Sequence, residues 1–191
     1  MDYTGKKIVV LGMGETGLSA ARWLHERGAR VRIADSRGVP PHLDKLRNDF
    51  TYAEVFTGPF NEDTFAGCDL AVISPGVPVA TPAIAEAIAG GLPVIGDIEL
   101  FAATIRGWKS KVIAITGANG KTTVTTLVGQ ICMDAGLETV VAGNIGLCVL
   151  DALSNLNGRQ PDVFALELSS FQLETVHSLR PDVAVVLNVT E

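Results

Sequence analysis

The sequence predicts an α/β fold made of two parallel-sheet units in series. Short apolar strands alternate with helix-like stretches along the 191 residues, which is the pattern of a parallel sheet covered by helices. Two glycine-rich loops, at 12–17 and 117–120, each follow an apolar strand and precede a helix-like stretch. The pattern restarts near residue 98, so we expect one domain at 1–98 and a second at 99–191.

The first unit begins with an apolar strand and a helix whose apolar residues recur at helical spacing. That helix should bury Leu18, Ala21, Trp23 and Leu24 and end at Gly28, where a left-handed cap is favoured. Pro82 favours the start of a later helix. The strands expected in this unit are 7–12, 31–35, 69–74 and 92–97, and the later helix is 82–91.

The second unit begins with a helical segment around Phe101, followed by a charged linker at 106–111. The helix after the second glycine loop should cover 121–135. The apolar side chains Phe171, Leu173 and Val176 are expected in the core. The strands expected in this unit are 112–115, 137–143, 161–168 and 181–189.

Composition excludes several function classes. The formal net charge is −6 and no run of Lys or Arg occurs, so we expect no nucleic-acid partner. No apolar run approaches the roughly 20 residues that span a bilayer, and the first residues lack a signal-peptide pattern. We therefore expect no membrane partner and a cytoplasmic protein. The three cysteines are widely spaced, which indicates reduced thiols.

The second glycine loop has the residues of a phosphate cradle. Gly117 and Gly120 allow backbone N–H groups to turn inward, and Lys121 supplies a fixed positive charge. The Thr122 hydroxyl can reach a phosphate-bound Mg²⁺. The general pattern G-x-x-x-x-G-K-[ST] would require a glycine at Ile115, so this loop is a shorter variant. Nucleoside triphosphate chemistry is the hypothesis, and an ordinary glycine-containing strand-to-helix turn is the alternative.

The first glycine loop fits G-x-G-x-x-G with Gly12, Gly14 and Gly17, and Asp35 ends the second strand about 20 residues later. Such glycines let the backbone approach a diphosphate, while the acidic residue can accept a hydrogen bond from a ribose hydroxyl. NAD and UDP both present these groups. The alternative is that the glycines only permit close packing of the helix on the strand.

The string TGANGKT at 116–122 resembles the phosphate loop of the Mur ligases and folylpolyglutamate synthases, which form amide bonds at the expense of ATP. A first glycine loop followed by this string is the order seen in the Mur ligases. Further strings are similar to the D-glutamate-adding branch of that family, namely GDIELF, GNIG, LELSSFQLE and LNVTE. The resemblance covers the whole chain.

The resemblance implies a Rossmann-like domain that binds a UDP precursor, followed by a truncated P-loop ATPase-type α/β domain. The implied reaction joins D-glutamate to UDP-N-acetylmuramoyl-L-alanine through an acyl phosphate, with ATP and Mg²⁺, in peptidoglycan precursor synthesis. Its alternatives are the L-alanine-adding Mur ligase, an NAD-dependent redox protein and a non-catalytic nucleotide sensor.

The resemblance and the two loop motifs together assign residues to each ligand. Lys121 and Glu167 are expected to be catalytic, and Thr122 and Glu167 to bind Mg²⁺. The ATP phosphates are assigned to Gly117, Ala118, Asn119, Gly120, Lys121, Thr122 and Thr123. The UDP substrate is assigned to Gly14, Glu15, Thr16, Asp35, Ser36, Arg37, Ser74, Pro75, Gly76, Asn144, Ser169 and Gln172.

Two of these assignments also have independent explanations. Glu167 ends an apolar strand, where a carboxylate can hold Mg²⁺ against phosphates, although it could equally be a surface carboxylate at a strand end. Ser169 and Gln172 have the spacing of a capping box for the next helix. The family's second metal-binding His, modified Lys and C-terminal domain are not in this sequence, so we expect substrate binding without turnover.

Overall fold

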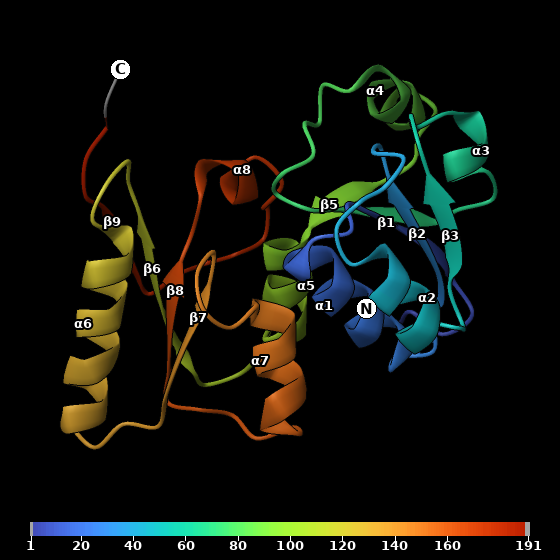
Figure 1. Ribbon diagram of the computed structural model, residues 1–191. Coiled ribbons are helices and arrows are strands. Elements are labelled where there is room, and N and C mark those ends of the chain that lie inside the picture. The colour runs from blue at the N-terminus through green and yellow to red at the C-terminus, as the bar shows by residue number, and fades with distance from the viewer. Residues whose placement is uncertain (1, 190–191) are drawn as a thin grey trace. The chain divides into compact units, whose positions relative to one another are not determined.

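The computed structural model describes residues 2–189, apart from the side chain of Lys45. The chain divides into two compact units, the first up to Asp97 and the second from Ile98 (Figure 1). Each unit has its own parallel sheet. We describe each unit separately.

Unit 1 is a five-stranded parallel sheet in the order β3-β2-β1-β4-β5. Because crossovers between parallel strands are right-handed, the helices before β2 and β3 cover one face and those before β4 and β5 the other (Figure 1). Its elements are β1 (Lys7–Leu11), α1 (Glu15–His25), β2 (Arg30–Asp35), α2 (Leu43–Asp49), β3 (Glu54–Thr57), α3 (Glu62–Phe65), β4 (Leu70–Ile73), α4 (Pro82–Ala89) and β5 (Val94–Gly96).

The core of unit 1 contains the apolar stripe predicted for the first helix. Leu18, Ala21, Trp23 and Leu24 are all buried, as predicted. The left-handed backbone predicted at Gly28 is confirmed by a φ of 79°. On the opposite face of the sheet, the buried cluster comprises Val9, Leu11, Ala34, Phe65, Ala71, Ile73 and Ile84.

Unit 2 is a four-stranded parallel sheet in the order β7-β8-β6-β9. Helix α6 packs across β6, β7 and β8, and α7 lies on the other side of the sheet (Figure 1). The elements from the boundary onward are α5 (Asp97–Thr104), β6 (Lys111–Thr116), α6 (Lys121–Asp134), β7 (Thr139–Gly143), α7 (Val149–Leu156), β8 (Val163–Glu167), α8 (Ser170–Leu173) and β9 (Val183–Val186).

The prediction that Phe171, Leu173 and Val176 lie in the core is wrong for two of these three residues. Phe171 is 57% exposed and Leu173 is 41% exposed. Helix α8 has only four residues, so it is too short to present an apolar stripe to the sheet. Its buried positions are instead polar, Gln172 within the helix and Thr175 just after it.

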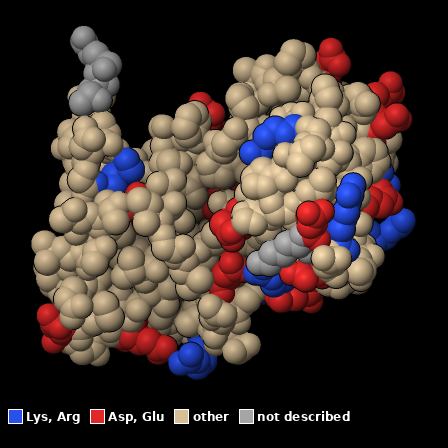
Figure 2. All heavy atoms as spheres, viewed as in Figure 1, with Lys and Arg blue, Asp and Glu red and all other residues tan. Residues whose placement is uncertain are grey.

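The distribution of charge on one face and the hydropathy of the described helices bear on the predictions from composition. On the face shown in Figure 2, Lys and Arg side chains lie scattered among Asp and Glu and do not merge into a basic stripe. Each helix within these residues is too short or too polar to cross a bilayer. Within the described residues, the three cysteines form no disulfide bond, in line with the reduced thiols predicted.

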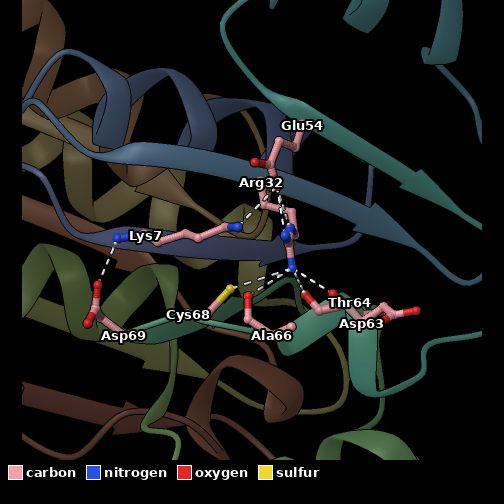
Figure 3. Close-up of polar contacts among 8 residues, drawn as sticks. All are labelled: Lys7, Arg32, Glu54, Asp63, Thr64, Ala66, Cys68 and Asp69. Atoms are coloured by element: carbon pink, nitrogen blue, oxygen red, sulfur yellow. Dashed lines mark hydrogen bonds and ion pairs between the residues drawn. The ribbon is translucent and has the colours of Figure 1, made fainter.

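A buried arginine on β2 forms hydrogen bonds that connect α3 to the sheet of unit 1 (Figure 3). The Arg32 side chain donates from Nε and Nη2 to Glu54 Oε2, at 2.9 and 2.7 Å. Its Nη1 donates to the carbonyl oxygens of Asp63 and Thr64, at 2.7 and 2.9 Å. Both residues lie in the last turn of α3, where carbonyl oxygens lack a full set of helical partners. The Asp63 carbonyl also accepts from the Ala66 amide, at 3.4 Å. Arg32 is 5% exposed, so its bond to the Thr64 carbonyl is buried, whereas its bonds to the half-exposed Glu54 are partly open to water.

Replacing Arg32 with Met should therefore lower the free energy of unfolding by about 2 kcal/mol, because the α3 carbonyls lose their charged donor, while the half-exposed Glu54 keeps its ion pair with Lys7 at 3.3 Å. Urea unfolding followed by circular dichroism measures this change. The matched control is Arg30→Met, at an exposed position of the same strand. Equal losses of stability in the two variants would contradict the role given to Arg32.

Candidate functional site

The strand order of unit 1 reverses between β1 and β4, which lie side by side at the centre of the sheet. In open parallel sheets, ligands bind in the crevice outside the carboxyl ends of such strands. The first glycine loop follows β1, and Ser74 to Gly76 follow β4. The Ser74 amide donates to the Leu11 carbonyl at 2.9 Å. Two predicted parts of the UDP site therefore lie together at this edge.

Gly17 and Gly14 of the first loop serve different physical purposes. A Cβ atom on Gly17 would overlap the carbonyl oxygen of Gly12, so Gly17 permits close packing. A Cβ atom on Gly14 would meet nothing within 4 Å. The packing explanation therefore accounts for Gly17, whereas Gly14 borders open space in which a ligand could approach the backbone.

Helix α1 begins directly after this loop, and no side chain caps its N-terminus at Gly14. The short helices α3 and α8 each have a capping box made by their own side chains, whereas α2, α4 and α7 also lack a side-chain cap. The glycine loop before it, rather than the missing cap alone, therefore distinguishes α1. The first N–H groups of a helix need acceptors, and the helix dipole favours negative charge there. The N-terminus of α1, with Glu15 and Thr16 in its first turn, is therefore suited to a diphosphate.

Asp35 lies beneath this loop and is 3% exposed. Its Oδ2 accepts from the Met13 amide at 2.8 Å and from Arg37 Nη2 at 2.7 Å. Its Oδ1 accepts from the Arg37 amide at 3.0 Å and from Arg37 Nε at 2.8 Å. These four bonds fill the acceptor capacity of a carboxylate. The ribose contact predicted for Asp35 would therefore require the Arg37 guanidinium, which is half exposed, to move away.

Hydrogen bonding sets the charge state of Asp35. Burial alone would raise the pKa of Asp35, but the bonds from Arg37 and from the Met13 amide outweigh burial and hold that pKa below its ordinary value. Asp35 is therefore a fixed anion that joins the end of β2 to the first glycine loop.

In unit 2, the second glycine loop borders a pocket of about 600 Å³ at the carboxyl edge of the sheet. The pocket brings together residues predicted to bind ATP and residues predicted to bind the UDP substrate, because all four strands end at this edge. Its polar and loop lining includes Thr116, Gly117, Ala118, Lys121, Asn144, Ser169, Ser170 and Asn188. The volume lies within the usual range for ligand pockets.

The second loop also leads into an uncapped helix. Gly117 has a φ of 146°, and a Cβ atom there would lie 3.1 Å from the Leu187 Cβ, so only glycine fits. Helix α6 starts at Lys121 after Gly120, and no side chain caps it. Lys121 Nζ donates to the carbonyl oxygens of Gly117 at 2.7 Å and Ala118 at 3.2 Å. The lysine thus lies across the loop, and Thr122 and Thr123 are exposed in the first turn.

Asn188 fixes the shape of the second loop and was missed as a site residue. Its amide group forms two hydrogen bonds with the Asn119 backbone, Asn119 N to Oδ1 at 2.9 Å and Nδ2 to Asn119 O at 3.0 Å. Its carbonyl oxygen accepts from the Ala118 amide at 3.1 Å. Phe171, wrongly predicted as core, also lines the pocket. The only sequence signal for Asn188 was its place in the string LNVTE.

Glu167 ends β8, in register with Ile115 of β6 and Gly143 of β7. It is 2% exposed, so the alternative of a surface carboxylate is wrong. Its Oε1 accepts from Asn144 Nδ2 at 3.1 Å, and its carbonyl oxygen accepts from the Asn144 amide at 2.8 Å. Glu167 and Asn144 therefore hold each other at the pocket edge.

The donor set beside the loop suits a hard cation. A carboxylate at Glu167 and a hydroxyl at Thr122 are oxygen ligands of the kind that Mg²⁺ prefers. Within residues 2–189, no three His, Cys, Asp or Glu side chains gather as a ready-made metal site. A divalent cation would therefore need oxygen atoms of a bound phosphate to complete its coordination.

The capping box predicted at Ser169 and Gln172 is confirmed. Ser169 Oγ accepts from the Gln172 amide at 3.2 Å, and Gln172 Oε1 accepts from the Ser169 amide at 3.1 Å. This pair fixes the turn after β8. Its polar groups lie next to Glu167 along the chain, at the same edge of the sheet as the second glycine loop.

Two consecutive parallel α/β units, each with a glycine loop leading into an uncapped helix, define an α/β protein with the architecture of nucleotide-binding enzymes. Family models agree with this class. The Mur ligase MurD-like N-terminal domain matches residues 6–96, and the Mur ligase middle domain matches residues 115–191. The chain belongs to the Mur ligase family and carries these two domains.

Curated relatives match the chain over its full length. A UDP-N-acetylmuramoylalanine--D-glutamate ligase of Methylobacillus flagellatus is 57% identical over 190 residues, which are 100% of this chain and 41% of that protein. The ligase of the same name from Chromobacterium violaceum is 54% identical over 193 residues, 100% of this chain and 43% of that protein. The chain therefore spans less than half the length of these relatives.

Solved structures support the fold. A UDP-N-acetylmuramate:L-alanyl-gamma-D-glutamyl-meso-diaminopimelate ligase from Neisseria meningitides matches 98% of this chain and 61% of its own, with a TM-score of 0.58 and 19% identity. The UDP-N-acetylmuramate-alanine ligase MurC from Thermotoga maritima matches 96% of this chain and 41% of its own, with a TM-score of 0.55 and 23% identity. Identities this low concern the fold alone.

Asp35→Asn should destabilise the chain in a pH-dependent way. Because the folded pKa lies below the unfolded value of about 3.9, charged Asp35 stabilises the fold above that value, and its contribution is lost as pH falls through the folded pKa. The stability gap between the chain and the variant should be largest near neutrality and shrink in acid. Urea unfolding at a series of pH values measures the gap.

The control for this experiment is Asp49→Asn, at an exposed position at the end of α2, which should change stability little at any pH. A stability gap for Asp35→Asn that stays constant from neutral to acid pH would contradict the role of Asp35 as a buried, hydrogen-bonded anion.

Proposed function

We propose that this chain supplies the precursor-binding and ATP-binding parts of a ligase that joins D-glutamate to UDP-N-acetylmuramoyl-L-alanine in peptidoglycan precursor synthesis. The observation that carries the proposal is the pair of glycine loops, each opening into an uncapped helix at the carboxyl edge of its sheet. The 57% identity to a curated ligase of that specificity supports the choice of substrates.

In this proposal, unit 1 binds the UDP part of the precursor. The diphosphate would accept hydrogen bonds from the backbone at Gly14, Glu15 and Thr16. Ser74, Pro75 and Gly76 would border the same crevice. The Arg37 guanidinium, now bonded to Asp35, would turn towards the nucleotide, which would free Asp35 for the ribose, and Ser36 would lie beside them.

Unit 2 would bind the reacting groups. The backbone from Gly117 to Gly120 would surround the ATP phosphates, and Lys121 would exchange its two carbonyl partners for phosphate oxygens. Glu167 and Thr122 would hold Mg²⁺, which neutralises phosphate charge when bound. Asn144, Ser169 and Gln172 would orient the muramoyl-alanine end of the substrate.

The proposed reaction has two steps. An oxygen of the alanine carboxylate attacks the γ-phosphorus of ATP, the bond between the γ-phosphorus and the bridging oxygen breaks, and ADP leaves. The amine nitrogen of D-glutamate then attacks the acyl carbon of the acyl phosphate, phosphate leaves, and the nitrogen loses a proton. Lys121 would stabilise the charge on the transferring phosphoryl group.

Binding should be separable from turnover in this polypeptide. The residues proposed for the precursor and for ATP all lie within the chain, whereas we assign no residue of the chain to D-glutamate. We therefore propose that the 191-residue polypeptide binds the UDP precursor without forming the amide bond.

Lys121→Ala in a longer, active enzyme should lower turnover by about 10²- to 10³-fold, because a preorganised charge is lost from the phosphoryl-transfer step. Binding of the UDP precursor should be unchanged, since its nucleotide site lies in unit 1. Steady-state kinetics and calorimetry measure the two quantities. The control is Lys6→Ala, an exposed lysine of unit 1. Near-normal turnover of Lys121→Ala would refute the proposed role.

Calorimetric titration of the 191-residue chain with UDP-N-acetylmuramoyl-L-alanine should show saturable binding, weakened at least about tenfold by Gly14→Ala. The added methyl group would enter the open space beside the loop, where the diphosphate must approach the backbone. Gly14 has a φ of −88°, so alanine fits without backbone strain. Gly90→Ala, whose Cβ would make only ordinary contacts, is the control.

NAD is the competing ligand in this titration, because the first glycine loop alone does not distinguish it from UDP. Binding of NAD in the absence of any binding of the UDP compound would overturn the proposed function and favour a redox protein.

A further inference from the structure

A second pocket in unit 2, of about 860 Å³, lies at the opposite end of β6 from the second glycine loop. One wall is the linker from Arg106 to Lys111, and the other is the segment from Ser178 to Asp182 before β9. Strand β6 has six residues, so about 20 Å of extended chain separates this pocket from the loop. The two pockets are therefore distinct sites.

Cations line this pocket in a chain whose formal net charge is −6. Arg106, Lys109, Lys111 and Arg180 border it, together with one carboxylate, Asp182. Lys111 Nζ lies 2.8 Å from Asp182 Oδ1, so this pair is neutral overall. Arg106, Lys109 and Arg180 form no ion pair within residues 2–189, and all three are exposed. The pocket thus carries an unbalanced positive charge.

Hydrogen bonds from the rest of unit 2 hold both walls in place. The buried Glu99 of α5 accepts from the amides of His177 and Ser178, at 2.7 and 2.8 Å. Asp182 Oδ2 accepts from the Val112 amide at 2.9 Å. The Lys111 amide donates to the carbonyl oxygen of Asp162 at 2.8 Å. A ligand would therefore meet a preorganised surface, which lowers the entropic cost of binding.

Two neutral side chains of the linker add recognition groups. The Ser110 hydroxyl oxygen is buried and has no hydrogen-bond partner in the part of the chain that the structure describes. An unsatisfied buried hydroxyl is unfavourable, and rotation of the Ser110 side chain towards the pocket would let a ligand oxygen satisfy it. Trp108, which packs against Phe164 with ring centroids 6.2 Å apart, also borders the pocket. Its indole can report on ligand binding.

We infer that this pocket is a second anion site, which takes a small soluble molecule with a diphosphate or triphosphate group. Guanidinium groups bind phosphate through paired hydrogen bonds, and the lysine adds a point charge. A concave pocket of this volume suits a small molecule better than a flat membrane surface. None of its residues belongs to the proposed catalytic site, so the inference stands independently of the proposed function.

The test is a fluorescence titration of the 191-residue chain with inorganic pyrophosphate. Trp108 should change its emission with a saturable midpoint, and Trp108→Phe should remove that change. The double variant Arg106→Gln with Arg180→Gln should shift the midpoint upward by about tenfold or more per lost cation. The matched control removes two exposed cations of unit 1, Lys6→Gln with Arg47→Gln, and should leave the midpoint unchanged.

Two further experiments establish where the pyrophosphate binds. Lys121→Ala should leave the Trp108 titration unchanged, because the second glycine loop lies at the other end of β6. Thermal unfolding of each variant verifies that it is folded. A midpoint unaffected by the arginine variant, or a signal lost in Lys121→Ala, would overturn the inference. Sedimentation with phosphatidylglycerol vesicles, in the absence of any pyrophosphate titration, would also overturn it and would indicate a membrane-facing surface.

Discussion

The arrangement of both candidate sites depends on backbone N–H groups that the protein leaves without side-chain caps at the starts of α1 and α6. The first turn of a helix has donors without intrahelical partners, and the aligned peptide dipoles favour negative charge there. The short helices α3 and α8 satisfy these donors with capping boxes. Helices α1 and α6 do not, and neither do α2, α4 and α7. The feature that sets α1 and α6 apart is the glycine loop that leads directly into each, at the carboxyl edge of a parallel sheet.

Each glycine loop also has a cation that the protein's own oxygen atoms hold. Lys121 donates to two carbonyls of its loop, and Arg37 bonds the buried carboxylate of Asp35. A phosphate or nucleotide must compete for these cations, so part of its binding free energy goes into breaking existing bonds. These bonds also keep the loops in shape without a ligand. Further bonds contribute, from the Asn119 amide to Asn188 in unit 2 and from the Met13 amide to Asp35 in unit 1.

Much of this fold could be predicted from local patterns, because apolar strands, glycine turns and the box formed by Ser169 and Gln172 are short-range features. The rest depends on side-chain contacts that no pattern shows. Arg37 is only two residues from Asp35, yet nothing in the sequence indicated that its guanidinium would saturate that carboxylate. Asn188 bonds Asn119, which is 69 residues away. The exposure of Phe171 was missed for a similar reason, since helical spacing does not reveal that a helix ends after one turn.

We propose that the two helix starts that follow the glycine loops are separate phosphate sites with different ligands. Backbone amide chemical-shift mapping of the 191-residue chain tests this most directly. UDP-N-acetylmuramoyl-L-alanine should shift the amides at 13–16, 74 and 76, and a non-hydrolysable ATP analogue should shift those at 117–123. If the UDP compound shifts only amides of unit 2, or neither ligand affects its loop, the claim is contradicted.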